Sequence, residues 1–312
     1  MWSDILLFSA SLAALLLSAR FFTGGAEKIG RYFRLSPFVI GLFIIGIGTS
    51  LPELVSAIFS IKKGVPEIIP GNILGANIAN ILLILGLTAA LSPSGIALSK
   101  RYVMIDLHYL IGTALLFVLA IYDGILSRGE GLALLSAFFI HSLYVLRSGE
   151  MPRREEAKTK NPKPFPLNGA LIMVLAAAGI YFAGDFTVTA LKRMATSLQL
   201  SPALVSLTLL SLGTTLPELV VSLLLVKEKK SEEAVGNVLG SCIFNVTVIP
   251  GVATLPGQLQ VPAELLALSP AIFLGASLFF YLLTQDKRIS HWEGMLFLLF
   301  YLVFILKTAA LI

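Results

Sequence analysis

Two glutamates stand inside apolar stretches of this 312-residue chain, and each closes a copy of one short motif. The copies read G-T-S-L-P-E at 48–53 and G-T-T-L-P-E at 213–218. The proline before each glutamate has no amide hydrogen and its ring collides with the preceding turn, so each motif predicts a break in a helix. A break frees backbone carbonyls beside the hydroxyls and the carboxylate, and in hydrocarbon all these oxygens need a partner. A bound cation would satisfy them together.

The oxygens gathered by these motifs suit a hard cation. Calcium takes about six to eight oxygen ligands at roughly 2.3–2.6 Å, and smaller adjoining positions suit sodium ions or protons. The nitrogen and sulfur ligands that favour zinc or copper are missing from the motifs. The predicted metal ligands are Glu53, Glu218, Asn80, Asn245, Thr49, Thr214, Ser50, Thr215 and Ser241, with freed carbonyls near Gly46 and Ser211 in reserve.

The asparagines come from a second duplicated motif, G-N-I-L-G-A-N-I-A-N at 71–80 and G-N-V-L-G-S-C-I-F-N at 236–245. In the first copy Asn72, Ala76 and Asn80 fall at i, i+4 and i+8 on one helix face, and the second copy repeats the spacing, so we expect Asn80 and Asn245 to reach the same centre as the glutamates. The glycines allow neighbouring helices to approach closely. Asn72 and Asn237 begin the same stripes, and we interpret them chiefly as residues that cap or bridge helices.

Composition assigns the chain to the membrane. Hydrophobic residues make up 56% and charged residues 13% of the sequence, against roughly 25% charged residues in soluble domains. We predict an all-α integral membrane protein with ten transmembrane helices. The predicted spans lie near 3–22, 37–61, 68–91, 102–122, 132–146, 167–186, 202–226, 234–255, 265–283 and 292–310. The fifth is predicted to be the shortest.

The two halves of the chain are copies of each other. At a constant offset of 165 residues, 36–80 and 201–245 are identical at 18 of 45 positions without a gap. We predict a first five-helix repeat at 1–146, a cytoplasmic linker at 147–166 and a second repeat at 167–312. An odd number of helices per repeat inverts the second copy, and inverted repeats with broken helices near the midplane are typical of secondary transporters.

Basic residues predict the orientation in the membrane. The loops on one side carry sixteen lysines and arginines, including six in the central linker, and the other side carries six. The positive-inside rule then places both termini outside the cell and the linker in the cytoplasm of a multi-pass cell-membrane protein. No basic groove with interleaved aromatic residues points to nucleic acid.

With both motifs duplicated at a fixed offset, the chain resembles the cation/calcium exchanger superfamily, and in particular its prokaryotic sodium/calcium exchanger branch. The resemblance implies antiport by alternating access, in which calcium leaves against an inward gradient of a monovalent cation. It also implies that Glu53, Glu218, Asn80 and Asn245 form the central ion site. By the same resemblance Thr49, Thr214 and Ser241 match flanking ligands for monovalent cations, and Ser50 and Thr215 line the cavity.

Two positions depart from the family's pattern. Ala76 stands where the family often has a hydroxyl residue, and Asn245 stands where some exchangers have aspartate. The formal charge at the centre is therefore −2, which one Ca²⁺ or two monovalent cations would neutralise. Electroneutral exchange with two Na⁺ or two H⁺ is one expectation, and a proton-coupled calcium exchanger of the same superfamily is the alternative function.

Other function classes fit less well. A cation channel could use the same carboxylates. An intramembrane aspartyl protease would need two aspartates at depth, but Asp123 and Asp185 both lie near predicted helix ends, and Phe182 replaces a glycine of the protease motif. We therefore predict no enzyme and no cofactor. A monomer suffices for the site, and the oligomeric state stays open. We also hypothesise that the first and sixth helices slide across the core.

Overall fold

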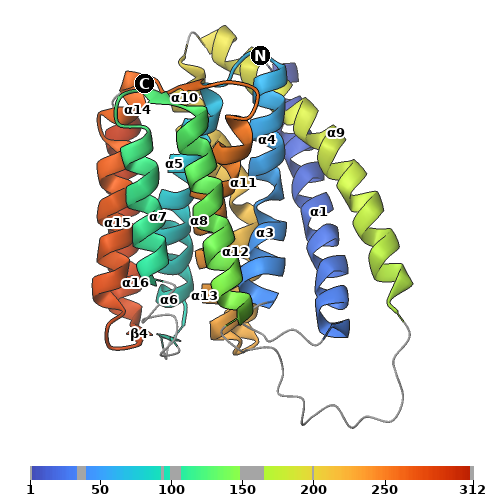
Figure 1. Ribbon diagram of the computed structural model, residues 1–312, viewed down its shortest axis with the longest axis vertical. Coiled ribbons are helices and arrows are strands. Elements are labelled where there is room, and N and C mark those ends of the chain that lie inside the picture. The colour runs from blue at the N-terminus through green and yellow to red at the C-terminus, as the bar shows by residue number, and fades with distance from the viewer. Residues whose placement is uncertain are drawn as a thin grey trace.

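The computed structural model describes residues 2–33, 40–92, 95–98, 107–147, 165–198 and 200–309, which form an elongated helical bundle (Figure 1). The predicted helical class is confirmed, and the predicted linker 147–166 lies almost wholly outside the described residues. Within them, seven helices are long and apolar enough to cross a membrane, or eight if a pair bent by 44° counts as one span. The count of ten spans stays a prediction.

The elements of the first half run in the following order, where η marks a π-helical segment: α1 (Trp2–Tyr32), η1 (Ile40–Ile45), α3 (Gly46–Thr49), α4 (Leu51–Lys62), α5 (Ile68–Ile78), η2 (Ala79–Leu85), α6 (Gly86–Ala90), β1 (Ile96–Ala97), α7 (Leu107–Ala120), β2 (Ile125–Leu126) and α8 (Arg128–Arg147).

Those of the second half are α9 (Leu167–Leu198), α10 (Pro202–Val205), η5 (Ser206–Leu210), α11 (Ser211–Thr214), α12 (Leu216–Lys227), α13 (Ser231–Ala253), β3 (Leu259–Gln260), α14 (Ala263–Leu266), α15 (Ser269–Leu283), β4 (Arg288–Ile289) and α16 (His291–Ala309).

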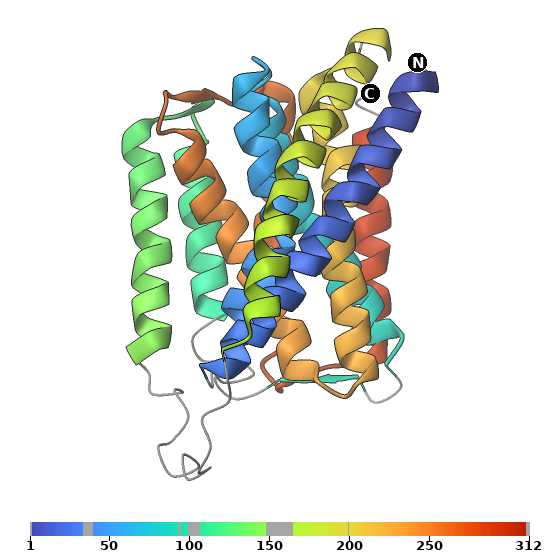
Figure 2. The ribbon, with the colours of Figure 1, turned by 90° about the vertical axis from the view of Figure 1, so that its right-hand side faces the viewer.

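The helices α1 and α9 are longer than predicted and lie side by side on the outside of the bundle (Figure 2). They have 31 and 32 residues, whereas the apolar runs suggested about 20 residues each. The extra turns of each helix pack against the other: Gly25, in the added part of α1, meets Gly169 of α9, and Arg193, in the added part of α9, lies 4.0 Å from Asp4 of α1. Helices that cover one another can continue past the apolar run.

The fifth predicted helix is also longer than expected. It corresponds to α8, which has 20 residues, whereas the described part of the fourth, α7, has 14. A capping box explains the earlier start of α8. Glu130 accepts hydrogen bonds from the backbone nitrogen and the hydroxyl of Ser127, at 2.8 and 2.7 Å.

The centre of the bundle is held by backbone contacts at two equivalent glycines. A Cβ atom added to Gly240 in α13 would collide with the carbonyl oxygen of Leu42 in η1. A Cβ atom added to Gly75 in α5 would collide with the carbonyl oxygen of Leu207 in η5. Both pairs are 165 residues apart, so the two halves make the same contact with each other in both directions.

Two short strand pairs, which the helical pattern did not predict, tie the halves together at the bundle's ends. Strand β1 pairs antiparallel with β4, and β2 pairs antiparallel with β3. Each pair takes one strand from each half of the chain. The helix α1 begins and α16 ends at one end of the bundle, the end opposite to β4 (Figure 1).

We predict that Gly240→Ala destabilises the protein, because the new methyl group would meet backbone that cannot move aside. Overpacking of this kind typically costs about 1–3 kcal/mol. The matched control is Gly112→Ala in α7, where an added Cβ meets nothing within 4 Å. Thermal unfolding in detergent should show a lower midpoint for the first variant only. Equal midpoints for the two variants would contradict the proposed backbone contact.

Candidate cation site

Both predicted helix breaks are present, one residue before the leucine of each motif. Between α3 and α4 the chain turns at Ser50, with φ −86° and ψ 6°. Between α11 and α12 it turns at Thr215, with φ −83° and ψ 0°. Proline then occupies the second position of each restarted helix, where its missing N–H costs nothing. The glutamates follow in the first turn, where the helix dipole favours negative charge.

The four residues predicted to form the centre are buried and short of partners. Glu53, Glu218, Asn80 and Asn245 are each at most 1% exposed. Among described residues, both Glu53 oxygens, Oε2 of Glu218, and the amide groups of both asparagines have no hydrogen-bond partner. The set thus leaves five carboxylate or amide oxygens unsatisfied. Unsatisfied buried oxygens cost several kcal/mol each in hydrocarbon, so they indicate a site for a ligand that coordinates oxygen.

The elements that carry these four residues meet in the middle of the bundle. The segment η2, which holds Asn80, packs against α12 and α13, and α13 also packs against α4. Ser50, which lies one turn before Glu53, donates to Glu218 Oε1 at 3.2 Å, so the two glutamates lie near one another. Two like charges in an apolar core need either protons or a cation between them. A divalent cation or two monovalent cations would cancel the charge.

Hydroxyl groups surround Glu218. Its Oε1 accepts hydrogen bonds from Ser50 Oγ and Ser241 Oγ, both at 3.2 Å. Ser241 Oγ also lies 3.0 Å from the carbonyl oxygen of Gly46 and 3.3 Å from Thr49 Oγ1. Hydroxyls, a carboxylate and the Gly46 carbonyl therefore lie together beside the first helix break. The prediction of freed carbonyls near Gly46 and Ser211 was wrong, because these oxygens still accept the backbone nitrogens of Ser50 and Thr215 at 3.2 and 3.0 Å.

No hydroxyl of the described residues is hydrogen-bonded to the Glu53 carboxylate. The position equivalent to Ser241 is Ala76, which has no oxygen. The equivalent of Ser50 is Thr215, whose hydroxyl donates to the carbonyl oxygen of Ser211 at 2.9 Å instead of to Glu53. The two carboxylates therefore differ in environment, although their motifs are nearly the same.

Asn72 and Asn237, the first asparagines of the duplicated motif, form hydrogen bonds with residues that surround the candidate site. Asn237 Nδ2 donates to Ser222 Oγ at 3.0 Å and to the Glu218 carbonyl at 3.3 Å, while its Oδ1 accepts from Thr49 at 3.1 Å. Asn72 Oδ1 accepts from Thr214 at 3.4 Å. Asn72 and Asn237 thus bridge helices and orient the threonines, as the sequence suggested. Ser222 is a supporting residue that the motifs did not reveal.

The remaining polar candidates contact residues outside the candidate site. Asn77 Nδ2 bonds back to the carbonyl oxygen of Ile73 at 2.7 Å. Asp123 accepts a hydrogen bond from the backbone of Ile125 at 3.0 Å, and Asp185 pairs with Lys63. The two aspartates therefore serve different contacts instead of forming a protease dyad. Within the described ranges, no group of three or more His, Cys, Asp and Glu residues could hold a metal ion, so the candidate site depends on amides and hydroxyls as well.

Comparison with known proteins gives consistent matches. The model of the sodium/calcium exchanger protein family matches residues 3–147 and 168–308. An uncharacterized membrane protein of Methanocaldococcus jannaschii is 32% identical over 95% of both chains. Sodium/calcium exchanger MaX1 of Methanosarcina acetivorans is 28% identical over 97% of both. The solved structure of the sodium-calcium exchanger NCX_Mj superposes with a TM-score of 0.71 at 31% identity, covering 97% of each chain.

We predict that Glu53→Gln and Glu218→Gln each weaken Ca²⁺ binding by roughly 100-fold or more, because an amide offers one neutral oxygen in place of a charged pair. Equilibrium ⁴⁵Ca²⁺ binding to purified protein measures the effect. The control is Glu67→Gln, which alters a glutamate at the end of the bundle, just before α5. Without Ca²⁺, both site variants should unfold at the same or a higher temperature, since a buried charge is removed. Unchanged Ca²⁺ binding would indicate a purely structural pair.

Proposed function

The chain belongs to the sodium/calcium exchanger family, and from that premise we propose that it is an antiporter exchanging Ca²⁺ for Na⁺ by alternating access. The observation that carries the proposal is the set of five unsatisfied oxygens on Glu53, Glu218, Asn80 and Asn245. These residues bind the transported ion at the centre of the bundle. Calcium and the coupling ion are cargo, so the protein needs no cofactor, and one copy of the chain contains the whole site.

The flanking hydroxyls provide further cation positions in this proposal. Thr49, Ser50 and Ser241 serve a position beside Glu218, where their oxygens lie within 3.3 Å of one another or of the carboxylate. Thr214 and Thr215 serve the corresponding position in the other half. The second position lacks one hydroxyl, because Ala76 stands where the other half has Ser241. It therefore holds a monovalent cation less tightly.

The proposed architecture is ten transmembrane helices in two inverted repeats, 1–146 and 167–312, joined by the linker 147–166. Reciprocal contacts support it: Gly240 against Leu42, Gly75 against Leu207, and strand pairs exchanged between the halves. The distribution of lysine and arginine supports external termini and a cytoplasmic linker. In the transport cycle α1 and α9 slide across the remaining helices and expose the site to each side in turn.

Charge at the site favours an electroneutral cycle. Two carboxylates give −2, which one Ca²⁺ or two monovalent cations neutralise, whereas three Na⁺ would leave +1. Asn245 keeps the charge at −2, because aspartate there would make it −3. The second candidate function is H⁺/Ca²⁺ exchange, favoured by the bare environment of Glu53, whose carboxylate could take a proton in place of Na⁺. A channel would use the same residues without a counter-ion.

The deciding experiment is ⁴⁵Ca²⁺ uptake into proteoliposomes loaded with Na⁺. Vesicles loaded with choline, and choline vesicles with an imposed pH gradient, are the comparisons, each with wild type and Glu53→Gln. We expect uptake that needs internal Na⁺, that Glu53→Gln abolishes, and that changes less than about twofold when a valinomycin-set potential is reversed, since no net charge moves. Uptake driven only by the pH gradient would establish proton coupling. Uptake without any counter-ion gradient would establish a channel.

We further predict that Ala76→Ser with Asn245→Asp makes exchange depend on membrane potential. The double variant adds a hydroxyl and a negative charge, so a third Na⁺ can be accommodated and net charge then crosses the membrane. One elementary charge in a 100 mV potential is worth about 2.3 kcal/mol. The exchange rate of the double variant should therefore change when the membrane potential is reversed in the same vesicles. The single variant Ala76→Ser is the control, because it adds no charge. Potential-independent exchange in the double variant would argue against charge as the determinant of stoichiometry.

A further inference from the structure

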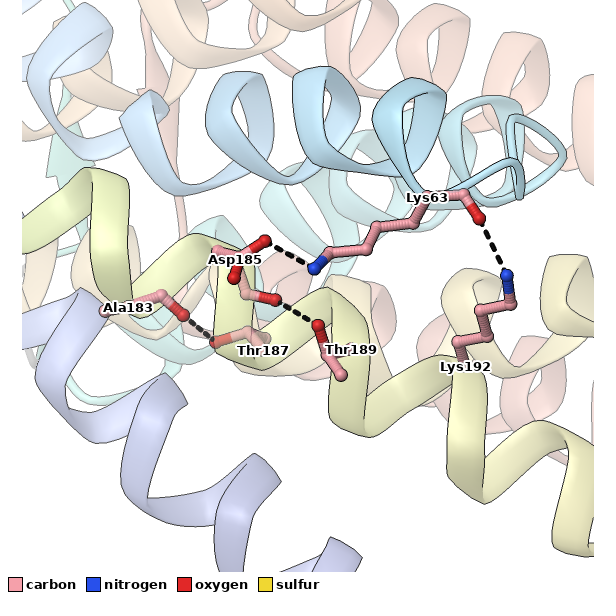
Figure 3. A network of polar contacts seen from close by, with 6 residues as sticks. All are labelled: Lys63, Ala183, Asp185, Thr187, Thr189 and Lys192. Atoms are coloured by element: carbon pink, nitrogen blue, oxygen red, sulfur yellow. Dashed lines mark hydrogen bonds and ion pairs between the residues drawn. The ribbon is translucent and has the colours of Figure 1, made fainter.

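An ion pair fastens α9 to the end of α4. Lys63 Nζ lies 2.6 Å from Asp185 Oδ1 of α9, and Lys192 Nζ of α9 donates to the carbonyl oxygen of Lys63 at 2.7 Å (Figure 3). The neighbouring Lys62 lies over the ring of Tyr181 in α9, 5.6 Å from its centre. These three contacts join α9, one of the two outer helices, to the core at the end of the bundle where α1 begins.

The repeat relates this ion pair to a second one with reversed charges. At the offset of 165 residues, Lys63 corresponds to Glu228 and Asp185 corresponds to Arg20. A basic residue after α4 faces an acidic residue on α9, and an acidic residue after α12 matches a basic residue on α1. All four residues differ in type between the halves, yet each pair keeps opposite charges.

The second pair is not formed in this structure. Glu228 is bonded to Lys230 Nζ at 2.5 Å, and Arg20 is exposed and has no ion-pair partner in the part of the chain that is described. The packing differs in the same sense, since α9 lies along α4 whereas α1 touches α12 only slightly. The two halves therefore have the same fold but hold their outer helix differently.

We propose that Arg20 and Glu228 pair in the opposite-facing state, in which Lys63 and Asp185 are apart, so that the four are positioning residues for transport. The inference rests on the proposed alternating access. When two inverted repeats differ in conformation, exchanging those conformations produces the state open to the other side. The contact between Lys63 and Asp185 then becomes a contact between Glu228 and Arg20.

The two contacts beside the ion pair have no equivalent in the other half of the chain. Lys62 over Tyr181 corresponds to Lys227 and Leu16, which has no ring, and Lys192 corresponds to Glu27, which cannot donate to a carbonyl. The ion pair alone keeps its complementarity. Its side chains are 30% and 33% exposed in the formed pair, and pairs this accessible are weak enough to break in every cycle. Each pair stabilises one state without trapping it.

Cross-linking tests whether the two pairs alternate. Lys63→Cys with Asp185→Cys should be linked by a short bifunctional thiosulfonate reagent in ion-free membranes. Arg20→Cys with Glu228→Cys should be linked when ion gradients drive the opposite state, and a protein already linked at the first pair should not link at the second. The native Cys242 is buried and can remain. Failure of the second pair to link under any gradient, or simultaneous linking of both, would overturn the inference.

Charge reversal tests whether the ion pair itself matters. Arg20→Glu should lower the exchange rate by about threefold, and Arg20→Glu with Glu228→Arg should restore it, as expected for an exposed pair. Arg20→Glu should also speed linking at the first pair, because the opposite state is disfavoured. A merely structural role would not change that rate. The control Lys28→Glu reverses a charge on the same exposed stretch of α1. An equal effect of the control, or no rescue, would count against pairing.

Failure of this inference can be told apart from failure of the proposed function. Wild-type protein that exchanges Ca²⁺ for Na⁺, but never brings Arg20 near Glu228, would remove the second ion pair and leave the exchanger intact. Linking at both pairs in turn, without counter-ion-dependent uptake by the wild type, would support the alternating ion pairs and overturn exchange.

Discussion

Burial of two carboxylates among apolar helices is the constraint on which the rest of this structure depends. Glu53 and Glu218 lie at the centre, and burying a carboxylate is expensive unless charge or hydrogen bonds compensate it. Both helices are broken one turn before the glutamate, so that hydroxyls and carbonyls can face the same volume. The glycines of α5 and α13 let these helices approach the broken segments backbone to backbone. Every feature of the core thus brings oxygen to one place.

The two halves of the chain surround their buried glutamates differently. Glu218 receives two serine hydroxyls, while the equivalent positions in the other half are Ala76 and a threonine that bonds to its own helix. An internal repeat starts with equal halves, and single substitutions then give each carboxylate its own environment. In the exchange that we propose, this difference would separate the positions at which calcium, sodium or protons are held. A single hydroxyl is enough to make the two sites differ, because it can form a hydrogen bond only with the carboxylate next to it.

Contacts of different stiffness distinguish the core from the two outer helices, α1 and α9. In the core, glycines meet backbone atoms, which cannot yield. Where α9 meets α4, the atoms nearest to a Cβ on Gly184 belong to the side chains of Val55 and Phe59. Where α1 meets α11, those nearest to a Cβ on Gly213 belong to the side chain of Leu12. Side chains can change rotamer, so the sliding that we propose for α1 and α9 meets softer contacts than those between the core helices. The exposed ion pair of Lys63 and Asp185 belongs to this adjustable boundary.

The sequence by itself determined the helical class and the membrane environment, and it predicted the residues of the candidate site. Proline has no amide hydrogen, glycine has no side chain and an intramembrane glutamate needs a partner, and these properties belong to the residue types whatever surrounds them. The motif repeated at a fixed offset therefore pointed to Glu53, Glu218 and their hydroxyl neighbours before any coordinates.

Only the tertiary structure decided which of these groups touch. It showed that Ser50 crosses to Glu218 in the other half, that Asp185 pairs with Lys63, and that α1 and α9 continue for ten residues or more beyond their predicted ends. Such contacts join residues more than 100 positions apart, and their formation depends on how whole helices pack. Local preference carries no information about a partner at that distance, so the pairing had to come from the fold.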